Sequence, residues 1–194
     1  MMDSFEISDA GGTAHWFMCI VDDAVGYCCV VPIAGHSASM LWEAYQYAWL
    51  QWVGPPDTLI ADGGKGFNSE EFTKQLARGG ALLHTTVARA PWQKGRVERS
   101  IQQRKLAMSK AISHTGAKGK EDINIIAMEA ASAANQRPGP AGVSAAMLLF
   151  GQKLKLHGEL YDDGRLAGYH PDVVDVGNGP ERRFQIRPAR RGAV

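Results

Sequence analysis

The first third of the chain has no positive charge: residues 1–62 contain neither lysine nor arginine, but they contain eight acids. Because the 194 residues together carry a net charge of +1, residues 1–62 carry −8 and the remainder carries +9. Seven basic residues and one acid lie between Arg89 and Lys110, and five arginines and one glutamate lie between Glu181 and Arg191. An acidic half and a basic half predict metal binding beside a polyanion site, although a solvated helix face and a disordered basic tail would give the same pattern.

Cysteine is scarce, and long apolar runs are missing. The three cysteines, Cys19, Cys28 and Cys29, lie in strand-like runs without the spacing of a zinc site, so we interpret them as buried thiols in a reducing compartment. No apolar run reaches the roughly 18 residues of a membrane span, and no basic region followed by an apolar stretch indicates a signal peptide. The length and the hydrophobic content of 45% predict one domain with a substantial core.

Turn residues divide the chain into strands and helices. Three apolar runs near the N-terminus predict an antiparallel meander of strands, at residues 3–7, 15–21 and 27–33. The elements expected after the meander are a helix from Ser37 or Ser39 to about Val53, strands at 58–61 and 81–87, and helices at 69–78, 96–113, 122–135 and 144–150. This order predicts an α/β fold with a mixed sheet and helices on both faces. From about Gly158 the sequence becomes polar and glycine-rich, and we expect an extension that is partly disordered.

Three acids stand where different elements could bring them together. Asp62 follows the buried strand at 58–61, Glu98 opens the long helix after a gap of 35 residues, and Asp3 lies in the first strand. Carboxylates from separate elements suit Mg²⁺ or Mn²⁺, and two such ions about 3.5–4 Å apart can support phosphoryl transfer. Each acid also has a simpler interpretation: Asp-Gly-Gly is typical of a turn, and a glutamate near a helix start is favoured by the helix dipole. Asp22, itself expected in a hairpin turn, is the alternative to Asp3.

The long helix has two faces with different chemistry. A period of 3.6 residues places one polar face and one apolar stripe side by side: Glu98, Gln102, Lys105 and Ser109 on the first, and Val97, Ile101, Met108 and Ile112 on the second. We expect the stripe to face the core, and Arg99 and Arg104 to point away from the polar face. Lys94 and Arg96 are expected in the loop before the helix, where they could close over a DNA end. Trp92 either stacks on a base, which contributes roughly 1–3 kcal/mol, or anchors this loop on the protein.

Four segments match motifs of a known family. The first is Asp3-Ser4-Phe5, and the second runs from Phe17 to Asp23 and is followed by Gly26-Tyr27. The third, Asp62 to Phe67, resembles the pattern D-N-G-x-x-F, with Gly63 in place of the usual Asn. The fourth, Pro91 to Arg99, resembles P-x-x-x-G-x-x-E-R. Over roughly residues 3–150 the chain therefore resembles the catalytic core of retroviral and LTR-retrotransposon integrases of the D,D-35-E type.

The resemblance implies an RNase H-like fold, with a mixed five-stranded sheet flanked by helices on both faces. It implies a catalytic core at residues 1–155 and an arginine-containing extension at 156–194. The activity implied is that of a metal-dependent polynucleotidyl transferase, which trims the 3′ ends of element DNA and joins them to target DNA. Asp3, Asp62 and Glu98 would be the catalytic ligands of Mg²⁺ or Mn²⁺, and Gln102 and Lys105 would lie near the DNA end.

The same resemblance implies partners and a location. The chain would bind element and target DNA, form a homodimer, and act in the nucleus after synthesis in the cytoplasm as part of a polyprotein. We expect the chain to be an excised core or a fragment of a decayed element. Two alternatives stay open: a non-catalytic domain derived from an integrase that binds DNA or dimerises, and a bacterial-type DDE transposase of the same fold.

Overall fold

The computed structural model describes residues 1–62, 64, 66–85, 91–139, 142–152 and 154, with the backbone alone for residues 91–94 and 96. The chain divides into two units, Met1–Asn135 and Gln136–Val194. The predicted extension at 156–194 lies outside the described residues, so its separation from the core stays a prediction. In the described part of the chain, no helix has the length and apolar character needed to span a membrane.

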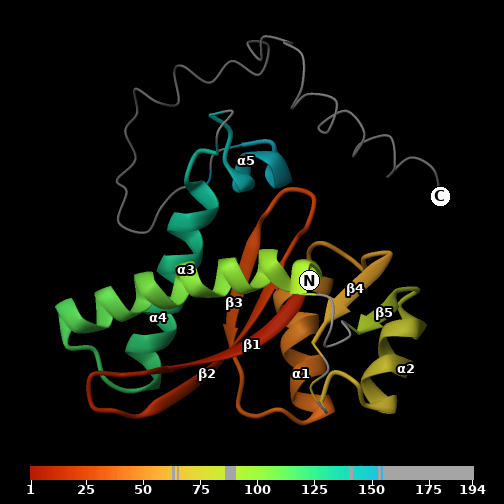
Figure 1. Cartoon of the computed structure of the whole chain (residues 1–194), viewed down its shortest axis with the longest axis horizontal. Helices are drawn as coiled ribbons and strands as arrows, with labels where there is room; N and C mark the ends of the chain where they lie inside the picture. The colour runs from red at the N-terminus through yellow and green to blue at the C-terminus, as the bar shows by residue number, and fades with distance from the viewer. Residues whose placement is uncertain (63, 65, 86–90, 140–141, 153, 155–194) are drawn as a thin grey trace. The chain divides into compact units, whose positions relative to one another are not determined.

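Five strands form one mixed sheet in the order β3-β2-β1-β4-β5, as Figure 1 shows for the larger unit. The strands are β1 (Met2–Ser8), β2 (Ala14–Val21), β3 (Cys28–Pro32), β4 (Thr58–Ala61) and β5 (Leu82–Thr85). The first three pair as an antiparallel meander, whereas β4 is parallel to both β1 and β5. The predicted mixed five-stranded sheet is confirmed. Residues 86 and 87, which were also predicted in the last strand, lie outside the described residues.

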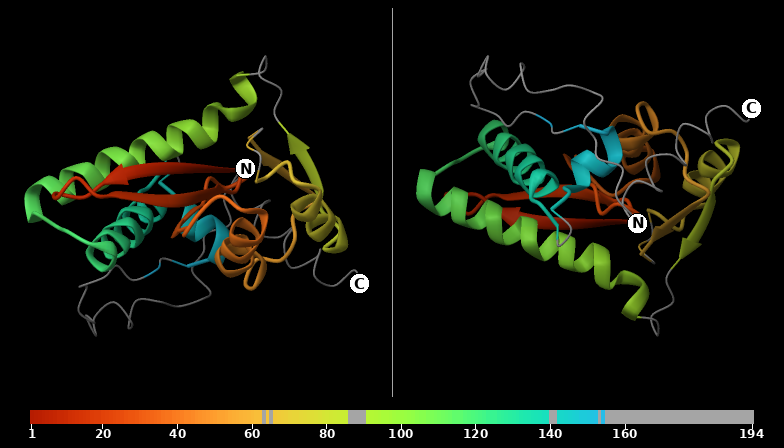
Figure 2. Two further views of the ribbon diagram at one scale, coloured as in Figure 1. Left: turned by 90° about the horizontal axis from the view of Figure 1, so that it is seen from below. Right: turned by 90° about the horizontal axis from the view of Figure 1, so that it is seen from above.

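Helices cover both faces of the sheet, as predicted. Alternation along β2 separates two cores: Cys19 and Val21 pack on one face and Met18 and Ile20 on the other. The first core includes residues of α3 (Pro91–Thr115) and α4 (Lys120–Gln136), and the second includes residues of α1 (Ala38–Tyr45) and α2 (Glu70–Arg78). Figure 2 shows α3 running along one side of the β1–β2 pair with α1 on the opposite side.

Serine side chains start two of the predicted helices. The Ser37 hydroxyl accepts a hydrogen bond from Met40 N at 3.4 Å, and the Ser69 hydroxyl accepts one from Phe72 N at 3.2 Å. The first helix differs from the prediction, because α1 passes into a π-helical turn, η1 (Gln46–Leu50). In that turn Gln51 N donates to Gln46 O, five residues back, at 3.1 Å.

The long helix α3 begins at Pro91, not near residue 96 as predicted. Proline is well suited to the first position of a helix, because its missing N–H would have no helical partner there and its φ is already helical. The prediction that Lys94 and Arg96 lie in a loop is therefore wrong: both are on the helix backbone. Their side chains, and that of Trp92, lie outside the described residues.

The smaller unit contains α5 (Ala145–Phe150) within its described part. The Ser144 hydroxyl starts this helix by accepting from Met147 N at 3.2 Å, and Gly151 ends it with a φ of 75°. A single bridge joins Pro138 to Ser144. The predicted short helix is confirmed with its capping residue.

Candidate active site

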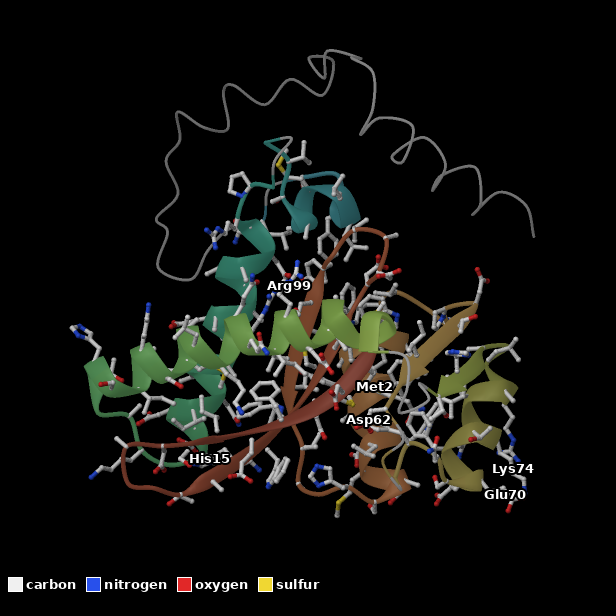
Figure 3. All side chains as sticks on the ribbon, in the orientation of Figure 1. Met2, His15, Asp62, Glu70, Lys74 and Arg99 are labelled. Carbon is white, nitrogen blue, oxygen red and sulfur yellow. The ribbon has the colours of Figure 1, made fainter. Side chains whose placement is uncertain are left out.

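Two of the three predicted acids lie on neighbouring strands. In the parallel pair β1–β4, Met2 is the register partner of Ala61, and both are buried in the core beneath α1 and α2. Because successive side chains in a strand alternate between faces, the next residues, Asp3 and Asp62, are directed to the opposite face of the sheet, where α3 packs. Figure 3 shows Asp62 beside Met2 at this end of the sheet. The register thus brings the two carboxylates to the same level on adjacent strands.

Local hydrogen bonds orient both carboxylates. Oδ1 of Asp62 accepts from Gly64 N at 2.7 Å, and Oδ1 of Asp3 accepts from Ser4 N at 2.7 Å. A Cβ atom on Gly64 would lie only 2.8 Å from Oδ1 of Asp62, so a side chain at this position would displace the carboxylate. Both acids are partly buried. Each is therefore an oriented oxygen donor held by its own backbone, which is how proteins commonly fix a metal ligand.

Glu98 is placed on the exposed side of α3. Its neighbour Val97 is buried at 3% exposure in the core that also contains Phe5 of β1. Among the described residues, however, no group of three or more histidine, cysteine, aspartate or glutamate side chains is arranged to hold one metal ion. The structure thus brings Asp3 and Asp62 onto neighbouring strands, but it does not arrange Glu98 with them as a three-carboxylate metal site.

The predicted faces of α3 are largely confirmed. Val97, Ile101, Met108 and Ile112 are all buried, with exposures between 0% and 8%, whereas Glu98, Gln102, Lys105 and Ser109 are all exposed. Arg99, labelled on α3 in Figure 3, is exposed too. The exposed side of α3 therefore presents amide and cationic groups beyond Glu98.

Arg104 was expected to point away from the polar face of α3. It does so, because it is only 5% exposed and lies in the core stripe. The signal was present in the spacing, because position 104 lies three residues after Ile101 and four before Met108 and so belongs to the same stripe. A guanidinium in a core stripe needs a polar environment there.

Asp9 is a buried carboxylate that was not recognised in the sequence. Its Oδ1 accepts from Gly11 N and Thr13 N at 2.8 and 2.9 Å, and its Oδ2 accepts from Gly119 N at 2.9 Å and lies 3.2 Å from Nε2 of His15. The bond from Gly119 and the bond from Thr13, more than His15, hold the pKa of Asp9 far below its usual range. Asp9 therefore joins the β1–β2 turn to the α3–α4 turn and has a structural role.

Asp22, the alternative to Asp3, closes a turn. Its Oδ1 accepts from Ala24 N at 2.9 Å and from Val25 N at 2.8 Å. This is the local pattern by which aspartate stabilises a hairpin connection. The interpretation of Asp22 as a turn residue is confirmed, which leaves Asp3 as the aspartate beside Asp62.

Comparison with known proteins gives matches among solved structures alone; no protein-family model and no curated protein matches the chain. The catalytic core domain of HTLV-2 integrase, solved with magnesium in a trimeric form, has a TM-score of 0.60 and 18% identity over 74% of this chain and 91% of that one. The core domain of BIV integrase has a TM-score of 0.58 and 17% identity over 76% and 91%. A simian T-cell lymphotropic virus intasome chain, in complex with the PP2A regulatory subunit B56 gamma, has a TM-score of 0.66 and 16% identity over 82% and 57%. The chain therefore has the RNase H-like fold of retroviral integrase catalytic cores.

Proposed function

We propose that the chain is the core of a polynucleotidyl transferase that trims the 3′ ends of element DNA and joins them to target DNA. The observation that carries this proposal is the Met2–Ala61 register, which places Asp3 and Asp62 level on adjacent strands facing α3. The fold shared with integrase cores supports it, because the predicted aspartates fall at the start of β1 and the end of β4 in that fold. Similar folds host unrelated activities, so the proposal depends on these side chains and not on the fold.

We propose Mg²⁺, or Mn²⁺ in its place, as the cofactor. Carboxylate oxygens that are already oriented by backbone N–H groups fit a hard cation. Asp3 and Asp62 would hold the metal, and Glu98 would join them from α3. When bound, the metal supplies activation of the attacking oxygen and stabilisation of the leaving oxygen. The HTLV-2 core was solved with magnesium, in dimeric and trimeric forms.

The DNA substrate would lie along the exposed side of α3. Between Glu98 and Glu121 the chain has no acid, and its exposed residues there include Arg99, Gln102 and Lys105. Cations and amides on one helix side suit contact with phosphates, which position nucleic acid without reading its sequence. Lys94 and Arg96 would extend this contact toward the helix start. We further propose that the chain forms a homodimer, acts in the nucleus and is synthesised as part of a polyprotein.

The decisive experiment is strand-transfer reversal on a branched DNA that mimics the joined product, with Mg²⁺ and with Mn²⁺. We expect turnover by the unaltered chain and a loss of roughly 100-fold or more in Asp3→Asn, Asp62→Asn and Glu98→Gln, since a metal ligand contributes several kcal/mol to the transition state. Asp57→Asn is the control, because Asp57 is an exposed acid just before β4. DNA binding without turnover by the unaltered chain would contradict the proposal and favour a non-catalytic DNA-binding domain.

A further inference from the structure

Two cysteines face each other in the core beneath α3 and α4. Cys19 in β2 and Cys28 in β3 are 0% and 1% exposed, and their Sγ atoms are 3.4 Å apart. In the antiparallel register Cys28 is the partner of Val21 and Cys19 is the partner of Val30, so the two cysteines are diagonal neighbours on one face. The distance is that of a hydrogen bond between sulfur atoms, with one thiol donating to the other.

A buried cation stands beside this pair. Besides the hydrogen bond from Cys19, the charge of Arg104, on α3, acts on Cys28 and lowers the pKa of its thiol. Its Nη1 lies 3.4 Å from both Ser100 O and Gln103 Oε1, which are long contacts, and its Nε has no hydrogen-bond partner among the described groups. In the described part of the chain no carboxylate forms an ion pair with Arg104. A buried guanidinium is costly without an anion, so Arg104 favours the ionised form of the nearby Cys28 thiol.

The remaining surroundings of Cys28 favour its charged form. The hydrogen bond from Cys19 and the charge of Arg104 lower the pKa of Cys28 against the opposing effect of burial, and the same pairing raises the pKa of Cys19. In the described chain, Cys19 and Arg104 act on Cys28 from its own side of the sheet, where Asp3 is the register partner of Cys19, whereas Cys29 and Tyr27 pack against the opposite core. From α4, the Asn135 amide accepts from Cys28 N at 2.9 Å and donates to Cys28 O at 2.7 Å, which fixes the backbone beneath the sulfur.

We infer that Cys28 is an oxidation site: its sulfur reacts with a small, uncharged peroxide, and Cys19, whose sulfur lies 3.4 Å away, is the thiol that resolves the product. The Cys28 sulfur attacks one oxygen of hydrogen peroxide, the O–O bond breaks, and hydroxide leaves to give a sulfenic acid. The Cys19 sulfur then attacks the Cys28 sulfur, an S–S bond forms, the S–O bond breaks, and water leaves with the Cys19 proton. Two electrons pass from the thiol pair to the peroxide.

Cys29 provides a matched control within the same strand. It is adjacent to Cys28 but packs against the opposite core, and it is more exposed than Cys28. Burial raises the pKa of Cys29 to about 12. If access alone governed oxidation, Cys29 would react first; if the thiolate governs it, Cys28 reacts first.

The first test treats the full chain with hydrogen peroxide and maps the products by mass spectrometry without reduction. We expect a Cys19–Cys28 linked peptide that is lighter by two hydrogen atoms and is released by a reducing thiol, with Cys29 unmodified. In Cys19→Ser the reaction should stop at a sulfenic acid on Cys28 that dimedone traps. Oxidation of Cys29 before Cys28, or the absence of the linked peptide, would overturn the inference.

The second test measures the thiolate directly by its ultraviolet absorbance as a function of pH, in a Cys29→Ser background. We expect a thiolate that titrates near neutral pH, with a midpoint raised by about one pH unit or more in Arg104→Met and largely restored in Arg104→Lys. Arg99→Met, an exposed arginine on the same helix, should leave the midpoint unchanged. Circular dichroism identifies any variant that fails to fold. In folded variants, an unchanged midpoint in Arg104→Met would contradict the pairing with Arg104.

Discussion

At the scale of single residues, the position of the Asp62 carboxylate depends on the absence of a side chain at Gly64. The hydrogen bond from Gly64 N to Oδ1 of Asp62 is 2.7 Å long, and a Cβ atom on Gly64 would lie 2.8 Å from the same oxygen. Gly64→Ala should therefore displace the carboxylate. We expect a loss of about 10- to 100-fold in Mn²⁺ affinity, the usual effect of disturbing the support of a metal ligand. Calorimetric titration would measure it.

A double-mutant cycle provides the control for this effect. If Gly64→Ala acts only through Asp62, it should add almost nothing in the Asp62→Asn background, because the group that it displaces no longer binds metal. Equal losses in both backgrounds would show that Gly64 affects the site by another route.

Asp9 makes stability depend on pH. Its pKa in the folded chain lies below the ordinary value of 3.8, with the hydrogen bond from Gly119 N as the largest cause. Because the pKa is lower in the folded state than in the unfolded state, Asp9 stabilises the fold at pH values above the unfolded pKa. This contribution is lost as the pH falls through the folded pKa.

We expect the free energy of unfolding in urea to decrease as the pH falls below about 5. We also expect Asp9→Asn to weaken both the fold at neutral pH and this pH dependence. The asparagine amide would place a donor against Gly119 N, which also donates. An unchanged pH dependence in Asp9→Asn, with Asp57→Asn as control, would contradict this role.

At the scale of elements, α3 shows what periodicity predicts and what it misses. The spacing of Val97, Ile101, Met108 and Ile112 predicted the buried stripe, because apolar residues at helical intervals form one face that is stable when it packs against the core. The same spacing includes Arg104, but a pattern based on apolar residues leaves it out of the stripe. Its charge acts on Cys28, on a strand 76 positions earlier in the sequence, and no local pattern reveals such a neighbour. Likewise, the strand end before Asp62 was predictable, whereas its register with Asp3 required the assembled sheet.

Two glycines near the site predict opposite effects of the same substitution. A Cβ atom on Gly66 would lie 2.4 Å from His36 O and 2.5 Å from Cδ1 of Leu41, so alanine there must separate the turn after β4 from the start of α1. We expect Gly66→Ala to lower the free energy of unfolding by about 1–3 kcal/mol. Gly95 lies within α3, and no described atom lies within 4 Å of where a Cβ atom would be, so Gly95→Ala should raise the free energy of unfolding by roughly 1 kcal/mol. Urea unfolding measures both, and a neutral Gly66→Ala would contradict the close packing.

At the scale of the whole molecule, the unequal charge along the sequence becomes a division between elements. The acidic first 62 residues supply β1 to β4 and both aspartates, whereas the basic residues that follow include the exposed cations of α3. Sequence alone predicted an acidic site beside a basic surface, and the fold places α3 on the face to which Asp3 and Asp62 are directed. The position of Glu98 relative to these acids could not be predicted, because it depends on how α3 packs and not on the spacing of 35 residues.

This division predicts how DNA binding responds to salt. If Lys105 contacts a phosphate, Lys105→Gln should weaken binding equally for different sequences and reduce the slope of log K against log salt by about 1. Lys74→Gln is the matched control: Lys74 is an exposed lysine on α2, paired with Glu70 at 2.6 Å, on the opposite face of the sheet from α3. Fluorescence anisotropy with duplexes of two unrelated sequences, over a series of salt concentrations, measures the slopes. Each phosphate that a cation neutralises releases counterions, so the slope reports which lysine contacts DNA. Equal slopes for Lys105→Gln and the unaltered chain would therefore exclude Lys105 from the DNA contact. A changed slope for Lys74→Gln would place DNA on the α2 side.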